Sequence, residues 1–245
     1  MTYDDGRPVL ILGEHDPALG DLTERIRALG YRARRIKTAE EALDLAQDRD
    51  VQARAIVMEA ALPALDLGRA VSILRARLAE GRPDSIIATA EYPDGETLDR
   101  LRDAHVTLAL WGAVGDHTLR FQINRASAEE HLLSLRQDSR IPTEWHAVLA
   151  VGGRRKRTSV YSLSGGGAYL ATPRPSQRGA EIAVSLPLPT GAVDAAGRVL
   201  YTNVPGNLHD TTLPNGMGIE FMALPAETRR ALEDTIRSVE DRHVV

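Results

Sequence analysis

The chain has 245 residues, of which 43% are hydrophobic and 26% charged, a mixture typical of a globular protein with one or two domains. The formal net charge of −4 gives no general attraction to nucleic acid or to an anionic membrane surface. Cysteine is absent, which excludes disulfides, thiolate zinc sites and cysteine nucleophiles.

The N-terminal half alternates short apolar runs with segments of helical periodicity. The runs predict strands at 9–12, 55–58, 85–88 and 106–110, and 33–36 is a candidate for a second, more polar strand. The periodic segments predict helices at 19–29, 40–46, 67–78, 98–103 and from 116 onward. Five strands alternating with five helices are typical of an α/β fold with a doubly wound parallel sheet.

The C-terminal half has a different pattern, with shorter apolar runs separated by glycine or proline. Candidate strands are 145–151, 158–163, 168–172, 181–186, 197–202 and 217–222. Five or six strands at this spacing predict a small antiparallel β-barrel or sandwich. Pro225 then begins a final amphipathic helix. The join between the halves lies near 126–141, where RASAEEHLLSLRQ reads as continued helix, and we place the domains at 1–130 and 131–245.

The N-terminal half resembles the receiver domain of bacterial response regulators over about residues 7–128. The matching stretches are VLILGEHDPALGDLTERIRALGY, EEAL and AIVMEAALPALDL. The resemblance implies two metal-binding acids, a phosphoaccepting aspartate, a hydroxyl group and a lysine at successive strand ends. In this sequence those positions hold, in the same order, Gly13 and Glu14, Glu59, Thr89, and Leu110 or Trp111.

These departures predict a receiver-like domain that is not phosphorylated. One acid and the lysine are missing, so phosphoryl transfer lacks the charges that stabilise its transition state. The leading interpretation is a degenerate receiver used for dimerisation or docking. The alternatives are a carboxylate at Glu59 that mimics a permanently phosphorylated state, and residual phosphorylation. No metal site is expected.

Two short motifs in the C-terminal half occur in order around one predicted strand: RQDSR at 136–140 and SLSGGGAYL at 162–170. Together they resemble the RxxxR and (D/N)xSxxG signatures of the PilZ domain, a small β-barrel, and the resemblance covers about residues 131–242. It extends through GMGIEFM at 216–222 and the C-terminal helix. It implies binding of the bacterial second messenger cyclic di-GMP by Arg136, Arg140, Ser162, Ser164, Gly166 and Gly167.

The chemistry of these residues suits the implied ligand. A guanidinium group donates in pairs to phosphate or to the O6/N7 edge of guanine, and glycine lets a flat ligand approach the strand. The family has aspartate or asparagine where this chain has Ser162, and loss of one buried hydrogen bond costs roughly 1–3 kcal/mol. We therefore expect weakened binding. Two alternatives stay open: the arginines as a solvated helix end, and the glycines as a bulge in a barrel strand.

These features together predict a non-enzymatic, cytoplasmic signalling effector that binds cyclic di-GMP and relays the signal to a protein partner. The resemblance suggests motility or envelope machinery as that partner, and a homodimer is a further expectation. GGRRKR at 152–157 reads as an exposed hairpin turn, with help in binding an anionic ligand or nucleic acid as the alternative. The sequence has no recognisable DNA-reading motif, no net basic charge and no apolar run of about 18 residues, so neither nucleic-acid binding nor membrane insertion is expected. The alternative is a protein-interaction adaptor whose receiver and PilZ domains are both degenerate and bind no nucleotide.

Overall fold

The computed structural model of the chain describes residues 6–13, 18–45, 47–48, 51–62, 67–79, 82, 84–128, 138–208 and 212–245. The contacts divide the chain into two compact units. The first comprises residues 1–135 together with 242–245, and the second comprises residues 136–241. The expected boundary at 130/131 lies between 129 and 137, outside the described residues, and so does most of the helix expected there.

The first unit alternates strands and helices along the chain, as expected. Its elements are β1 (Val9–Leu12), α1 (Ala18–Ala28), β2 (Ala33–Ile36), α2 (Ala39–Leu45), β3 (Ala55–Glu59), α3 (Leu67–Leu78), β4 (Ile86–Ala90), α4 (Gly95–Asp103), β5 (Leu108–Trp111) and α5 (Asp116–Ser127). All neighbouring strands pair in parallel in the order β2-β1-β3-β4-β5. The predicted doubly wound sheet is therefore confirmed.

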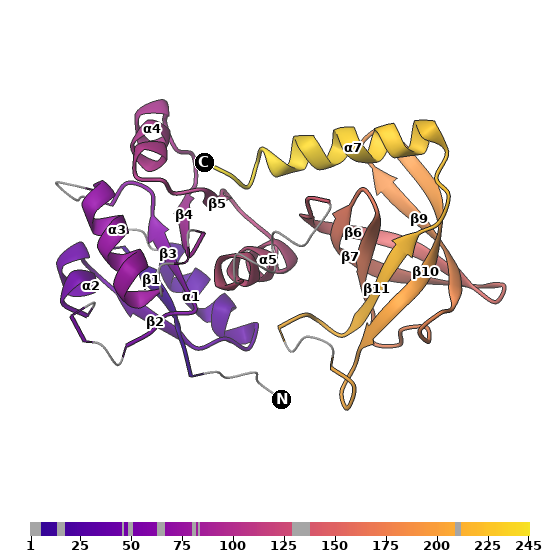
Figure 1. Cartoon of the computed structure of the whole chain (residues 1–245), viewed down its shortest axis with the longest axis horizontal. Coiled ribbons are helices and arrows are strands. Elements are labelled where there is room, and N and C mark those ends of the chain that lie inside the picture. Colours follow the sequence, from indigo (N-terminus) through magenta and orange to yellow (C-terminus); the bar gives the residue numbers. More distant parts are fainter. Residues whose placement is uncertain are drawn as a thin grey trace. The chain divides into compact units, whose positions relative to one another are not determined.

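Helices cover both faces of this sheet (Figure 1). Alternate residues of the inner strands belong to two separate hydrophobic cores, one on each face. In β1, Val9 and Ile11 pack with α1 and α5, whereas Leu10 and Leu12 pack on the side of α2, α3 and α4. This division follows from the two-residue repeat of a strand. It also explains why the inner strand β1 is apolar throughout, as sheets buried on both faces require, whereas the edge strand β2 carries Arg34 and Arg35.

The C-terminal residues of the chain pair with the edge strand β5 inside the first unit. Val244 forms an antiparallel bridge with Leu108, and the Ala109 N–H donates to the His243 carbonyl at 3.1 Å. The Gln122 amide also donates to the His243 carbonyl, at 2.8 Å. Burial lowers the pKa of the His243 imidazole, and the nearby charges of Arg242 and Arg125 lower it further. The tail thus satisfies backbone groups at a sheet edge that would otherwise stay unpaired.

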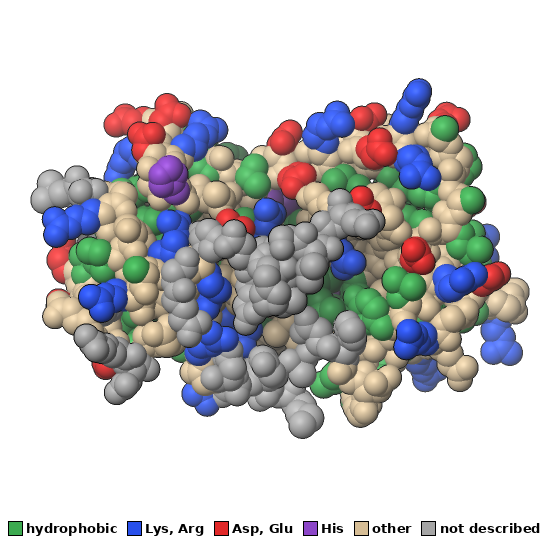
Figure 2. Space-filling model, in the orientation of Figure 1, with side chains coloured by type: hydrophobic (Ala, Val, Ile, Leu, Met, Phe, Trp, Pro, Cys, Tyr) green, Lys and Arg blue, Asp and Glu red, His purple; other side chains and the backbone are tan. Residues whose placement is uncertain are grey.

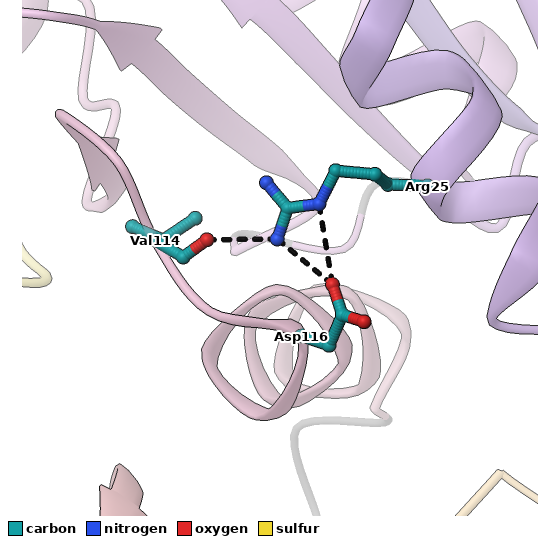
Figure 3. Close-up of polar contacts among 3 residues, drawn as sticks. All are labelled: Arg25, Val114 and Asp116. Atoms are coloured by element: carbon teal, nitrogen blue, oxygen red, sulfur yellow. Dashed lines mark hydrogen bonds and ion pairs between the residues drawn. The ribbon is translucent and has the colours of Figure 1, made fainter.

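Arg25 of α1 fixes the loop between β5 and α5 in the same unit (Figure 3). Its guanidinium donates to the Val114 carbonyl at 2.7 Å and to the Asp116 carboxylate at 2.9 and 3.2 Å. Asp116 is the first residue of α5, where a negative side chain is favoured by the helix dipole. One arginine therefore connects α1, the loop and the start of α5.

The second unit is a closed antiparallel barrel with one long helix. Its strands are β6 (Ile141–Val151), β7 (Arg154–Ser164), β8 (Gly167–Ala171), β9 (Glu181–Leu188), β10 (Gly191–Asn203) and β11 (Gly216–Phe221), and its helix is α7 (Ala226–Glu240). The order around the barrel is β10-β11-β8-β7-β6-β9. Leu232 and Ile236 of α7 pack into the barrel core. The expected barrel and final helix are confirmed.

Several barrel strands begin earlier than their apolar runs indicate. β6 begins at Ile141, four residues before the expected start, and a register shift separates its pairs at Pro142 and Trp145. A second shift lies between Val160 and Ser162 in the pairing of β7 with β8. The β6–β7 connection is the expected exposed hairpin, with Gly152 and Gly153 both at positive φ.

Candidate ligand-binding site

The glycine run of the second motif forms the connection between β7 and β8. Ser164 ends β7 and pairs with Gly167, the first residue of β8, so that Gly165 and Gly166 form a two-residue turn. The Ser164 hydroxyl donates to the Gly167 carbonyl at 3.3 Å, and the Phe221 N–H donates to the Gly166 carbonyl at 2.8 Å. These bonds fix the turn to its own hairpin and to β11.

Two different constraints explain the glycines. A Cβ on Gly167 would overlap the carbonyl oxygen of Ile219 in β11, so this position is closed by the barrel itself. A Cβ on Gly166 would lie 2.8 Å from the carboxylate of Asp138, which is an exposed side chain. Gly165 and Gly166 are not in the left-handed φ region, so the turn makes no conformational demand for glycine. What glycine provides at Gly166 is space beside a carboxylate.

The other candidate residues lie at different depths around this turn. Arg136 lies outside the described residues, whereas Arg140 is exposed directly before β6. Ser162 and Ser164 are 3% and 6% exposed. Ser162 pairs with Pro142 of β6 and Tyr169 of β8. The structure therefore brings Ser162, Ser164 and the glycines together, but the Ser162 hydroxyl does not lie on an open surface.

A pocket of about 330 Å³ opens beside the turn, at the lower end of the size range of small-molecule sites. The segment before β6 contributes Asp138 and Ser139, and the turn contributes Gly165 and Gly166. The rest of the lining comes from one face of α7: Arg229, Glu233, Ile236, Arg237 and Glu240. Figure 1 shows α7 lying along the barrel, and Figure 2 shows acidic and basic side chains intermixed along its exposed side.

Sequence reasoning missed the residues of this pocket apart from Gly166. Asp138 and Ser139 lie inside RxxxR, at positions that the motif leaves open. The polar residues of α7 recur at helical spacing, a signal that also fits an ordinary solvated face. Ser139 links the two segments, because its hydroxyl donates to the Glu240 carboxylate at 2.6 Å.

The receiver-like unit brings its own candidate residues to the carboxyl ends of adjacent strands. Glu59, the last residue of β3, is in register with Thr89 of β4, which in turn is in register with Leu110 of β5. Leu110 is buried in the core, and the Trp111 indole N–H points at the Val244 carbonyl at 3.4 Å. Glu14 lies outside the described residues. The lysine position is thus filled by apolar side chains that serve packing.

Glu59 and Gly13 fit each other sterically. A Cβ on Gly13 would lie 2.8 Å from the Glu59 carboxylate and would also overlap Leu19. That carboxylate oxygen is buried and has no hydrogen-bond partner among the described residues. Arg35 of β2 donates to the Gly13 carbonyl at 3.0 Å. The longer glutamate therefore occupies space next to the position where receiver domains carry an acid.

Among the described residues, no three acidic or histidine side chains are grouped so that they could hold a metal ion. None of the helices in the described part of the chain is long and apolar enough to cross a membrane.

Comparison with protein families gives a match to the PilZ domain over residues 134–238. The resemblance stated from the two motifs is thereby confirmed for the second unit. The match includes Arg136 and Arg140, the glycine turn, and α7 up to its last turn. The comparison with curated proteins returned no match.

Solved structures resemble each unit separately. The PilZ domain of YcgR from Escherichia coli with c-di-GMP is 20% identical, with a TM-score of 0.36, over 44% of this chain and 93% of that one. MotI, an inhibitor of motility from Bacillus subtilis, is 19% identical, with a TM-score of 0.36, over 44% and 50%. The receiver domain of a sensor histidine kinase from Pseudomonas aeruginosa is 24% identical, with a TM-score of 0.41, over 50% and 99%.

Proposed function

We propose that this protein is a non-enzymatic cytoplasmic signalling effector. Its barrel binds cyclic di-GMP, and the bound state is passed on to a protein partner, for which motility or envelope machinery is the leading candidate. The observation that carries this proposal is the match of residues 134–238 to the PilZ domain. Its RxxxR signature is complete at 136–140, and its second signature is present at 162–167 except for Ser162.

The proposed ligand residues are Arg136, Arg140, Ser162, Ser164, Gly166 and Gly167. Arg140 is exposed immediately before β6, where its guanidinium is free to meet a phosphate or a guanine edge from solvent. Gly166 has no side chain of its own, so its backbone is open to a ligand beside the Asp138 carboxylate. This arrangement supports a flat ring of the ligand over the β7–β8 turn, with the ligand's phosphates near Arg140.

We further propose that the receiver-like unit is not phosphorylated. Glutamate in place of aspartate moves the carboxylate outward by one methylene, and it already fills the space beside Gly13. The apolar residues at the lysine position leave no cation there to neutralise a phosphoryl group. A docking or dimerisation role uses the surface of this unit and needs none of the missing chemistry.

One observation favours a second candidate function, a protein-interaction adaptor that binds no nucleotide. Ser162, which replaces the aspartate or asparagine of the motif, is buried and offers only a short hydroxyl. If no other residue replaces the missing acceptor, the barrel keeps its fold and loses its ligand.

Titration calorimetry of cyclic di-GMP against the intact chain separates the two functions. A binding isotherm that saturates supports the effector function. Absence of binding at ligand concentrations up to the millimolar range supports the adaptor function, provided that circular dichroism shows a folded protein.

A further inference from the structure

The missing acceptor at Ser162 raises the question of which residue could read a guanine base at this site. The Watson–Crick edge of guanine carries two donors, N1–H and the exocyclic N2 amine, which a carboxylate can accept together. Ser162 cannot do this, because it is 3% exposed and lies between β6 and β8. An acceptor must therefore come from elsewhere around the turn.

Asp138 has the position and the chemistry required. Its carboxylate lies 2.8 Å from the place that a Gly166 Cβ would take and 3.8 Å from that of Gly165, so it is directly beside the turn. It lines the pocket and is exposed. Among residues 138–208 and 212–245, none donates a hydrogen bond to it, so both of its oxygens are open to a ligand within this part of the chain.

The segment that carries Asp138 is held in place by α7. The adjacent Ser139 donates to Glu240 at 2.6 Å, and Glu240 lies on the same helical face as Arg237 and Glu233, which also line the pocket. α7 is in turn fixed to the barrel core through Leu232 and Ile236. Asp138 is therefore presented at the pocket by a connected set of contacts.

The charges of the pocket suit a base better than a phosphate. Three carboxylates, those of Asp138, Glu233 and Glu240, face two guanidinium groups, those of Arg229 and Arg237. Carboxylates attract the N–H donors of a guanine edge and repel phosphate oxygens. Guanidinium groups donate to O6 and N7 or stack on the ring. The phosphates belong with Arg140, outside this pocket.

From this geometry we infer that Asp138 is the guanine-reading residue, and that one base of the ligand enters the pocket between the β7–β8 turn and α7. The inference rests on the proposed function, because it assigns a specificity-determining residue to the same ligand. It places the acceptor inside the RxxxR segment, at a position that the motif itself does not specify.

The experiment compares two ligands on the intact chain by calorimetry. Cyclic di-GMP carries the 2-amino group, whereas cyclic di-inosine monophosphate lacks it and keeps N1–H. The variants are Asp138→Ala and Asp138→Asn. The control is Asp194→Ala, which removes the same charge from an exposed position on β10, away from the lining of the pocket.

We expect the wild type and Asp194→Ala to prefer cyclic di-GMP by about 5- to 150-fold, the usual discrimination of a paired base contact. Asp138→Ala should bind cyclic di-GMP more weakly and lose most of this preference. Asp138→Asn keeps one carbonyl acceptor but replaces the second with an amide donor, so it should retain only part of the preference.

Two results would overturn the inference while leaving the proposed function intact. One is wild-type binding of cyclic di-GMP with no preference over the inosine analogue. The other is an Asp138→Ala variant that keeps its preference, or that binds cyclic di-GMP more tightly because a repulsive carboxylate has gone. A wild type that binds neither ligand refutes the proposed function itself, and the inference falls with it.

Discussion

Replacement of Gly167 by alanine is expected to destabilise the barrel, whereas the same replacement at Gly166 is not. Neither glycine has φ in the left-handed region, so alanine adopts both backbone conformations without strain. The difference lies in what the new methyl group meets. At Gly167 it overlaps the backbone carbonyl of Ile219, and at Gly166 it meets the end of the exposed Asp138 side chain.

The size of each stability change depends on whether the group that meets the new methyl can move. β11 is held between β8 and β10 in a closed barrel, so relief at Gly167 requires a shift of strands. Overpacking of this kind costs about 1–3 kcal/mol. The carboxylate beside Gly166 rotates away at little cost, and loss of glycine from the unfolded chain contributes up to about 1 kcal/mol of stabilisation.

Urea denaturation followed by the fluorescence of Trp145 measures both effects on the barrel. Trp145 packs against the barrel core, and a Trp111→Phe background removes the other tryptophan of the protein. With an m-value of about 2 kcal/mol/M, a loss of 2 kcal/mol lowers the midpoint by about 1 M. Equal midpoints for Gly167→Ala and Gly166→Ala would refute the assignment of the glycine run to two separate constraints.

Three further outcomes are expected. Acetyl phosphate with magnesium should leave no stable phosphoryl group on the chain or on Glu59→Asp, because Gly13 and the missing lysine remain; a mass increase that disappears in Glu59→Gln would contradict this. The lowered pKa of His243 means that the unfolded chain takes up the proton first, so the stability of the first unit should be full above about pH 6.5 and fall below it. His243→Gln should flatten this loss in urea denaturation at pH 7.5 and 5.5, and an unchanged pH profile would count against the buried imidazole. Ser162→Asn should not tighten cyclic di-GMP binding if Asp138 supplies the acceptor, and a clear gain would return that role to the motif position.

The order and type of the elements could be predicted from the sequence because local patterns determine them. Val9–Leu12 is apolar throughout and Ala55–Glu59 is apolar up to its last residue. Helical periodicity follows each of them, and this alternation predicts a parallel sheet. The start of β6 could not be predicted in the same way. Ile141, Pro142 and Thr143 are buried by barrel closure and a register shift, which are tertiary effects.

Contacts between distant segments could not be predicted from the sequence either, because they are also tertiary effects. No local pattern distinguishes Asp138 from any other exposed acid. It becomes a candidate only because the fold places its carboxylate beside Gly166, which is distant in the sequence. The tail is too short to read as a strand, yet Val244 pairs with Leu108. The arginines and the serine–glycine motif could be recognised because their spacing alone carries the resemblance.

The most direct test of the central claim is calorimetry of cyclic di-GMP on the intact wild-type chain, with Arg140→Ala and Arg155→Ala measured at one salt concentration. Arg155 is an exposed arginine of β7 outside both motifs and serves as the charge-matched control. Loss of a charged hydrogen bond of about 1.5–3 kcal/mol predicts that Arg140→Ala weakens binding by roughly 10- to 150-fold. Arg155→Ala should stay within about twofold of the wild type, as expected for a screened surface charge. A wild type without saturable binding, or equal losses in the two variants, would contradict the claim that this barrel holds cyclic di-GMP through its motif residues.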